Sequence, residues 1–304
     1  METQTKLVKK SVSVVNQACE KVKGFRDLHR KMEDKMRISD LSQSTWVTYG
    51  HALGQVCLHF GKLPQDISEG EINRYLADLT RKRTPPSLSN FKITVYSLRY
   101  CYRLLGLKNR VVELPRLKHN HKLPVVLNQA ESKALFQTPE RLKERVLLSL
   151  MYSAGLRAGE ASRLKICDID SGRMMIHIRQ SKGKKDRYVP LSPLILKGLR
   201  EYYRIYHPVE YLFNGCKPGA RLSVSGMKWI LRKVVKMCKL QKEITLHTLR
   251  HTYATHLLEL GMDIVTIKEL LGHERIETTM IYLHVAIPTR SNLFSPFDRL
   301  YPTS

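Results

Sequence analysis

The chain has 304 residues, 42% of them hydrophobic, and its 52 Lys and Arg outnumber 27 Asp and Glu, which gives a formal net charge of +25. This composition supports a packed core and excludes wholesale disorder, and no apolar run reaches the roughly 18 residues that a transmembrane helix needs. A charge this large opposes compaction through self-repulsion, so it indicates a polyanionic partner.

The N-terminus and the cysteines indicate where the protein works. The basic stretch 1–10 is not followed by an apolar segment, so we expect no secretory signal and no membrane association. The six cysteines are scattered and form no C-x-x-C pair, which argues against a zinc module or a disulfide scaffold. We therefore expect a protein of the reducing cytoplasm.

The first third of the chain predicts helices. Residues 1–40 read as a basic, helical N-terminal extension, and residues 41–106 as a helical DNA-binding domain. Within this domain one helix covers about 45–60, and the next begins at a capping box of Ser68 and Glu71. A third helix follows a Pro-Pro-Ser break and runs to the end of the domain.

A basic linker is predicted over residues 107–124, which contain two prolines and five Lys or Arg. Since it joins two basic domains, it suggests that the chain closes around a DNA duplex as a clamp.

The second half reads as a domain over 125–288 with a C-terminal tail over 289–304. Its first helix begins at the cap residue Asn128. Two alternating runs, 174–178 and 188–191, predict a β-hairpin with a basic tip between them, and helices resume afterwards.

Three blocks are rich in Lys and Arg and nearly free of acids, namely residues 81–122, 179–187 and 211–242. Eleven basic residues accompany one acid in the first block, and eight accompany none in the third. One such block is often a solvated face, but three together suit a long track of phosphates.

The segment from Leu246 predicts a helix with polar groups beside an apolar stripe. The stripe consists of Leu246, Leu249, Tyr253, Leu257 and Leu260. Beside it lie His247, Arg250 and His251, which places an imidazole next to a guanidinium. A guanidinium suits two phosphate oxygens, and an imidazole exchanges a proton near pH 7. A zinc site at these histidines is disfavoured because H-E-x-x-H is absent, so we predict no metal ligands.

Other candidate site residues lie in short patterns. Arg157 lies between two glycines at a break between helices, where the backbone can approach a ligand closely. His273 follows Gly272, a predicted helix stop, and Tyr282 lies on the next short helix. Taken alone, a residue like His273 is more often a satisfied turn residue, one like Tyr282 is usually a packing residue, and Arg157 is also compatible with a surface position in an ordinary helical corner.

The patterns occur in one order along the chain. The order is G-L-R-x-G-E over 155–160, Lys182 in a basic hairpin, L-H-x-L-R-H over 246–251, L-G-H over 271–273, and Tyr282. In this order and spacing the chain resembles the tyrosine recombinase, or phage integrase, family, and within it the bacterial Xer-type recombinases. The resemblance covers roughly residues 40–290 and is strongest over 246–285.

The resemblance implies a mainly α fold with a small antiparallel β-hairpin or sheet. It implies a two-domain DNA clamp, in which a helical, SAM-like core-binding domain precedes the tyrosine recombinase catalytic domain. The implied activity is that of a site-specific recombinase, which cuts and rejoins DNA through a 3′-phosphotyrosyl intermediate without metal or ATP. The same active site serves integration, excision, inversion, dimer resolution and transposition.

The resemblance also implies roles for six residues. Tyr282 is the nucleophile, Arg157 and Arg250 hold the non-bridging phosphate oxygens, Lys182 gives a proton to the leaving 5′ oxygen, His247 is a general base or hydrogen-bond partner of the nucleophile, and His273 is a further phosphate donor. Ser181 stands where many relatives have Gly, so Lys184 and Lys185 stay alternatives to Lys182.

DNA is the predicted partner, and we expect no cofactor, since neither an acidic cluster for Mg²⁺ nor a G-x-x-x-x-G-K-[ST] loop is present. Twelve basic residues are predicted to contact DNA: Arg81, Lys82, Arg83, Lys92, Arg99, Arg103, Lys118, Lys122, Lys184, Lys185, Lys228 and Arg232.

The implied substrate is double-stranded DNA with paired recognition sites. The implied assembly is a homotetramer on synapsed DNA and a monomer when free, with the tail 289–304 docked on a neighbour or folded back in cis. A second recombinase or a DNA-bending protein is a further candidate partner, and we expect association with the bacterial nucleoid.

Two alternatives stay open. The first is a type IB topoisomerase-like enzyme, which shares the chemistry but exchanges no partners. The second is a non-catalytic helix-turn-helix regulator that reads DNA with residues 257–282. A covalent protein–DNA adduct separates the regulator from both enzymes.

Overall fold

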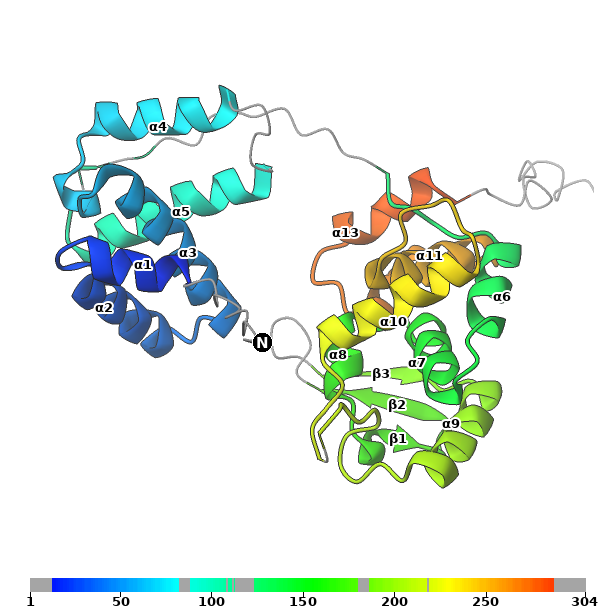
Figure 1. The fold of residues 1–304 in the computed structure, drawn as a ribbon. Helices are drawn as coiled ribbons and strands as arrows, with labels where there is room; N and C mark the ends of the chain where they lie inside the picture. Colours follow the sequence, from blue (N-terminus) through cyan, green and yellow to red (C-terminus); the bar gives the residue numbers. More distant parts are fainter. Residues whose placement is uncertain are drawn as a thin grey trace, which may run out of the picture. The chain divides into compact units, whose positions relative to one another are not determined.

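The computed structural model describes residues 13–81, 88–107, 109–110, 112, 123–179, 186–217 and 219–286. The chain divides into two compact units, residues 1–120 and 121–304, which we call unit 1 and unit 2 (Figure 1). Most of the predicted linker 107–124 and the whole tail 289–304 lie outside the described residues.

Unit 1 is helical. Its elements are α1 (Val14–Lys21), α2 (Phe25–Ile38), α3 (Gln43–Phe60), the 3-10 helix η1 (Pro64–Asp66), α4 (Glu69–Arg81) and α5 (Leu88–Leu104). The side chains of Ser13 and Ser42 cap α1 and α3, and the predicted capping box of Ser68 and Glu71 precedes α4. These local signals explain why the sequence predicts the helix starts.

One apolar core holds unit 1 together. Leu53 of α3 and Leu98 of α5 are fully buried in it. Ala18 of α1, with Phe25 and Met32 of α2, belongs to the same core, although residues 1–40 were predicted as an extension. The first two helices are therefore packed against the helices that follow.

Unit 2 combines helices with a small sheet (Figure 1). Its elements are α6 (Gln129–Gln137), α7 (Leu142–Ser153), α8 (Ala158–Arg163), η2 (Ile166–Asp168), β1 (Ile169–Asp170), β2 (Met175–Ile178), β3 (Arg187–Pro190), α9 (Pro193–Tyr206), α10 (Val224–Met237), α11 (Leu246–Glu259), α12 (Ile264–Leu271), α13 (Glu277–Met280) and η3 (Ile281–His284). The mainly helical fold with a small antiparallel sheet confirms the predicted fold class.

The sheet is antiparallel, in the order β1-β2-β3. The predicted hairpin is present as β2 and β3, with Ile176 opposite Val189 and both residues buried. Strand β1 was not predicted, because two residues are too few to show alternation. The hairpin tip, residues 180–185, lies outside the described residues.

Two central helices position the site. α7 and α11 pack against each other, and their apolar residues Leu147, Leu150 and Leu249 have no exposed surface. The stripe predicted for α11 was wrong at one end, because Leu260 is the C-cap of the helix and is 81% exposed. Within the described ranges, no helix is both long and apolar enough to cross a lipid bilayer.

Candidate active site

Helix α11 begins with a capping box. The side chain of Thr245 accepts from the backbone N–H of Thr248, and that of Thr248 accepts from the backbone N–H of Thr245. The cap fixes the first turns of the helix, which carry His247, Arg250 and His251. Arg250 was predicted to lie beside the apolar stripe, but its side chain has no exposed surface.

Arg250 is held mainly by backbone carbonyls. Its Nη1 donates to the carbonyl oxygen of Gly155 at 2.8 Å, and its Nη2 to that of Leu271 at 2.6 Å. Its Nε is buried and has no partner among the described residues. Burial, with the charge of Arg157 next in weight, lowers the pKa of Arg250 to about 9, so the group stays charged at neutral pH.

Arg157 caps helix α8 and reaches across to the end of α12. Its backbone N–H and its Nη1 both donate to the carboxylate of Glu160, each at 2.8 Å. Its Nη2 donates to the carbonyl oxygen of Gly272 at 3.1 Å. The turn before α8 depends on Gly155, whose φ of +56° lies in the left-handed region that favours glycine.

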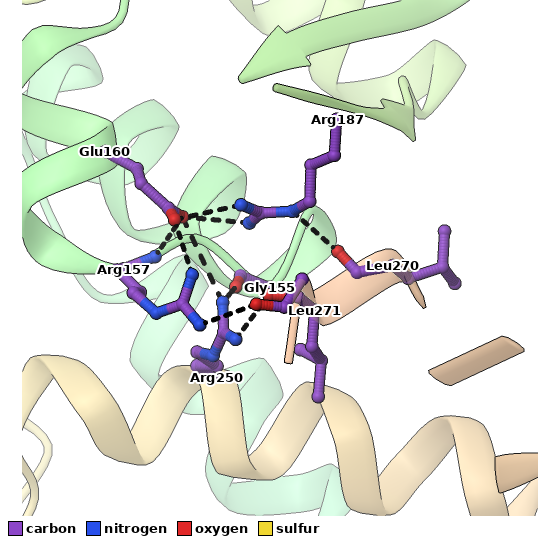
Figure 2. Close-up of polar contacts among 8 residues, drawn as sticks. Gly155, Arg157, Glu160, Arg187, Arg250, Leu270 and Leu271 are labelled. Carbon is purple, nitrogen blue, oxygen red and sulfur yellow. Dashed lines mark hydrogen bonds and ion pairs between the residues drawn. The ribbon is translucent and has the colours of Figure 1, made fainter. Parts of the chain in front are cut away.

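A third arginine, Arg187, joins this cluster from the start of β3. Its Nη1 and Nη2 donate to the two oxygens of Glu160, both at 2.9 Å, and its Nε donates to the carbonyl oxygen of Leu270 at 2.9 Å. Figure 2 shows Arg157, Arg187 and Arg250 converging on Glu160 and on the carbonyls of Gly155, Leu270 and Leu271. We call these three arginines and Glu160 the arginine cluster.

Glu160 is ionised despite its burial. Only 2% of its side chain is exposed, and burial by itself raises the pKa of a carboxyl group. The hydrogen bonds and charge of Arg187, followed by those of Arg157, outweigh this effect and lower the pKa of Glu160 to about 2. The arginine cluster thus contains one negative and three positive groups.

Tyr282 lies next to this cluster, on η3. Its hydroxyl is 3.2 Å from Nδ1 of His251, and its ring stacks on that of His273 at a centroid distance of 6.5 Å. The residue is 1% exposed. Burial raises the pKa of Tyr282, while the charges of Arg250 and Arg157 act to lower it.

Two imidazoles, those of His251 and His273, contact the tyrosine, and a third, that of His247, contacts His251. The ring of His247 meets that of His251 edge to face at 4.4 Å, and Nδ1 of His273 lies 2.9 Å from the hydroxyl oxygen of Thr279. Burial, with help from neighbouring positive groups, lowers the pKa of His251 to about 4 and that of His273 to about 3. Burial and the charges of Arg250 and Arg157 also lower the pKa of His247. All three rings are therefore neutral at pH 7.

The structure brings together five of the six predicted catalytic residues. They are Arg157, His247, Arg250, His273 and Tyr282, which are linked by contacts through His251 and the end of α12. Lys182, the sixth, lies outside the described residues, as do Lys184 and Lys185.

The sequence reasoning missed three members of the site. Glu160 closes the G-L-R-x-G-E pattern, and its position three residues after Arg157 is a capping-box signal that was available. His251 was noted on α11 but given no role, whereas the described contact to the Tyr282 hydroxyl comes from its ring. For Arg187 no local signal existed, because its partners come from α8 and α12.

The predicted DNA-contacting residues are only partly described. In unit 1, Arg81 and Arg103 are exposed, while Arg99 donates to the carbonyl oxygen of Val112 at 2.7 Å. Arg99 and Arg103 line a cavity of about 580 Å³ together with Tyr49 and other residues. The remaining candidates are Lys92, which is half-buried on α5, Lys228 and Arg232, which are exposed on α10, and Lys82, Arg83, Lys118 and Lys122, which lie outside the described residues.

Within the described part of the chain, no group of three or more His, Cys, Asp or Glu side chains is placed to hold an ion. The rings of His247 and His251 pack edge to face, and Nδ1 of His251 lies 3.2 Å from the Tyr282 hydroxyl.

Comparison with known proteins places the site in a family context. The model of the phage integrase family matches residues 125–287, which contain all the residues of the site. A putative integrase/recombinase of Sinorhizobium fredii, y4qK, is 36% identical over 277 residues, which cover 90% of this chain and 89% of that protein. The tyrosine recombinase XerC of Lacticaseibacillus casei is 32% identical over 255 residues, or 78% of this chain and 83% of its own.

Solved structures are similar over most of the chain. A crystal structure of XerA recombinase is 28% identical, with a TM-score of 0.51, and the match covers 92% of this chain and 99% of that one. A structure of the XerH site-specific recombinase bound to its difH substrate has a TM-score of 0.66 at 22% identity, over 89% of this chain and 90% of that one. At that identity the second likeness speaks for the fold alone.

Proposed function

Because the chain belongs to the phage integrase family of tyrosine recombinases, which are DNA strand-exchange enzymes, we propose that it cuts and rejoins DNA through a covalent bond between Tyr282 and a 3′ phosphate. The family match and the names of the relatives support recombination over the two alternatives, a topoisomerase-like enzyme and a non-catalytic regulator.

One observation carries the assignment of the site. The Tyr282 hydroxyl lies 3.2 Å from the His251 imidazole, and its ring stacks on His273, directly after the Leu271 and Gly272 carbonyls that hold Arg250 and Arg157. A tyrosine has an ordinary pKa of about 10 and attacks poorly at neutral pH unless a base takes its proton. Fixed cations stabilise the charge that develops on a phosphate under attack, which is a large contribution in a site of this kind.

The reaction follows from these groups. The Tyr282 oxygen attacks the phosphorus, its proton passes to an imidazole, and the bond from phosphorus to the 5′ oxygen breaks. Lys182 returns a proton to that oxygen. Attack by a free 5′ hydroxyl on the phosphotyrosine reverses these steps and rejoins the strand. The phosphodiester is exchanged for a phosphotyrosyl ester of similar energy, so no external energy source is needed.

Arg157 and Arg250 would bind the non-bridging oxygens. The buried Nε of Arg250 supports this role, since it is a charged donor that lacks a partner among the described residues. His247 would accept the proton of the nucleophile directly or through His251, whose ring lies between His247 and the Tyr282 hydroxyl. His273 would be a further donor to the phosphate.

The Tyr282 hydroxyl must become accessible before it can react. With 1% of the residue exposed, a DNA phosphate reaches the hydroxyl only after the short segment α13–η3 shifts. The segment is suited to such a shift because it consists of four helical residues followed by a single 3-10 turn.

The Tyr282→Phe variant tests the proposal. We expect this variant to bind DNA as tightly as the unmodified chain but to form no covalent adduct, because it lacks the attacking oxygen. The substrate is a duplex selected by the unmodified chain from a randomised library, nicked so that the adduct is trapped, and the adduct is measured as an SDS-stable band.

Tyr253→Phe is the matched control, since Tyr253 is also buried and belongs to the same small apolar cluster as Tyr282. This control should still form the adduct. A band of normal intensity from Tyr282→Phe would refute the assignment of the nucleophile.

The partner would be double-stranded DNA with paired sites, bound at the bacterial nucleoid, and the active assembly a tetramer. XerH, a recombinase of similar fold, is bound to its difH substrate in its structure, and the net charge of +25 of this chain suits the same class of ligand. The tail carries the apolar residues Leu293, Phe294, Phe297 and Leu300, which suit docking on a neighbouring copy. A second recombinase or a DNA-bending protein would be an accessory to this assembly.

Truncation after Pro288 tests the assembly. We expect single-site binding to be retained and the pairing of two DNA sites to be lost in a gel-shift assay, since the docking residues are removed. Unchanged pairing would reject trans docking of the tail.

A further inference from the structure

Arg187 binds Glu160, and its side-chain donors are all used within the protein. All three of its side-chain nitrogens donate to the protein, two to the Glu160 oxygens and one to the carbonyl oxygen of Leu270. Only 9% of its side chain is exposed. In this it differs from Arg250, whose Nε has no partner within the described ranges. Arg187 therefore acts on the reaction through other residues and not through the phosphate.

Arg187 offsets the negative charge of Glu160 within the arginine cluster. Glu160 lies 2.8 Å from Nη1 of Arg157 and 4.0 Å from Nη1 of Arg250, so its negative charge acts on both proposed phosphate clamps. A carboxylate in a buried site interacts strongly with such neighbours. The bidentate pair with Arg187 opposes that charge with a positive charge of its own.

The position of Arg187 also joins three parts of unit 2. It is the first residue of β3, it bonds to Glu160 of α8, and it bonds to the last turn of α12. A Cβ atom placed on Gly272 would lie 3.0 Å from its Cδ, so the stem of Arg187 packs against the turn that carries His273. Lys182 precedes it by five residues along the chain.

We propose that Arg187 is a positioning residue that offsets the negative charge of Glu160, so that the positive potential of Arg157 and Arg250 acts on the scissile phosphate. The proposal rests on the function proposed above and adds a residue to it. Lysine is not equivalent at this position, because an ammonium group cannot form the bidentate pair and reach the Leu270 carbonyl together.

A comparison of single and double variants of the full chain tests this role. In Arg187→Gln, only Arg157 and Arg250 remain to offset the negative charge of Glu160. Because less positive charge then acts on the phosphate, the rate of adduct formation at saturating nicked DNA should fall about 100-fold. Adding Glu160→Gln removes that negative charge, so the double variant should form the adduct at least about tenfold faster than Arg187→Gln. A double variant as slow as Arg187→Gln would overturn the proposal, since a merely structural anchor is not restored by losing its partner.

Arg145→Gln is the control for loss of a guanidinium in unit 2. Arg145 donates to the carbonyl oxygen of Pro139 and lies on α7, outside the arginine cluster. Its adduct rate should stay within about twofold of that of the unmodified chain. An equal slowing in this variant would show that the loss in Arg187→Gln is not specific.

Urea unfolding gives a second measurement that needs no DNA. The midpoint should fall in Arg187→Gln, which leaves the Glu160 charge undercompensated, and rise again in the double variant. Strictly additive midpoints would overturn the neutralising role. If the unmodified chain forms no adduct while this non-additivity is observed, the proposed function fails and the charge relation of Arg187 and Glu160 stands.

Discussion

Arg250 is a fully buried cation, and the groups that offset its charge bear on how it would bind a phosphate. Two carbonyl oxygens and the Glu160 carboxylate at 4.0 Å offset the cost of burying its charge. Its Nε, which has no partner among the residues that the structure describes, is a buried donor, and this costs about 1–3 kcal/mol. A phosphate oxygen that accepts from Nε would recover this cost. Part of the binding energy for the reacting phosphate is therefore already built into the free protein.

The histidines of the site make stability depend on pH. In the folded protein the pKa of His251 is lowered to about 4 and that of His273 to about 3, from about 6.5 in an unfolded chain. The stability that the neutral rings contribute is present above pH 6.5 and is lost as the pH falls through the folded values. Glu160, with its pKa lowered to about 2, adds a further loss below about pH 4.5.

We therefore expect the free energy of unfolding to decrease as the pH falls from 6.5 to 4. Each histidine that takes up a proton on unfolding contributes up to about 1.4 kcal/mol per pH unit. Urea titrations at several pH values measure this slope, and His273→Gln should reduce it. A slope that is the same in His273→Gln and the unmodified chain would contradict the lowered pKa of His273.

At the scale of elements, the ends of α7 and α12 supply the carbonyls that hold the arginines. Gly155 follows α7 and Gly272 follows α12, with φ values of +56° and +61°. Both glycines allow the chain to turn after the helix, so that the carbonyl of Gly155, after α7, and the last carbonyls of α12 accept from the guanidinium groups. The site therefore depends on how two helices end as well as on its charged side chains.

Gly272→Ala tests this dependence, with Gly261→Ala as its control. Both residues have positive φ, so alanine costs roughly 1–2 kcal/mol of stability at either position. A new Cβ at Gly261 meets nothing within 4 Å, whereas at Gly272 it meets Cδ of Arg187 at 3.0 Å. We expect a similar loss of stability in both variants, but a loss of adduct formation of about tenfold or more only in Gly272→Ala. Equal rates of adduct formation in the two variants would contradict the dependence of the site on how α12 ends.

Local signals in the sequence were sufficient for most elements. Caps such as Ser68 and Asn128, and glycines that stop helices, lie within four residues of the helix ends that they define. The burial of Arg250 was not predictable in this way, because its partners Gly155 and Leu271 are 95 and 21 residues away. The site residues were predicted from the order of motifs, and their contacts arise only when distant segments pack.

At the scale of the whole molecule, the net charge of +25 should make the affinity for DNA depend on the salt concentration. Binding that neutralises phosphates releases counterions, so the affinity falls with salt by about 0.9 logarithmic units per phosphate for each logarithmic unit of salt. We expect a slope steeper than about −5 between 50 and 200 mM salt, as for six or more phosphates. Fluorescence anisotropy with labelled duplex measures it, and a flat response would contradict a role for the charge in DNA binding.

Single variants resolve this charge effect further. Arg103→Gln should reduce the slope by about one, since Arg103 is exposed and predicted to contact a phosphate. Arg30→Gln is the control, because Arg30 is exposed on α2 beside Asp27 and outside the predicted contacts.

The arginine cluster takes several of its acceptors from the main chain, at Gly155, Leu270, Leu271 and Gly272. A carbonyl does not depend on the identity of the side chain next to it, so evolution is free to replace Leu270 by another helix-forming residue without disturbing its acceptor. A one-residue insertion or deletion within α12 is different, because it rotates the helix end by about 100° and displaces three acceptors together. Homologous enzymes should therefore tolerate divergence in the composition of α12 and reject changes in its length.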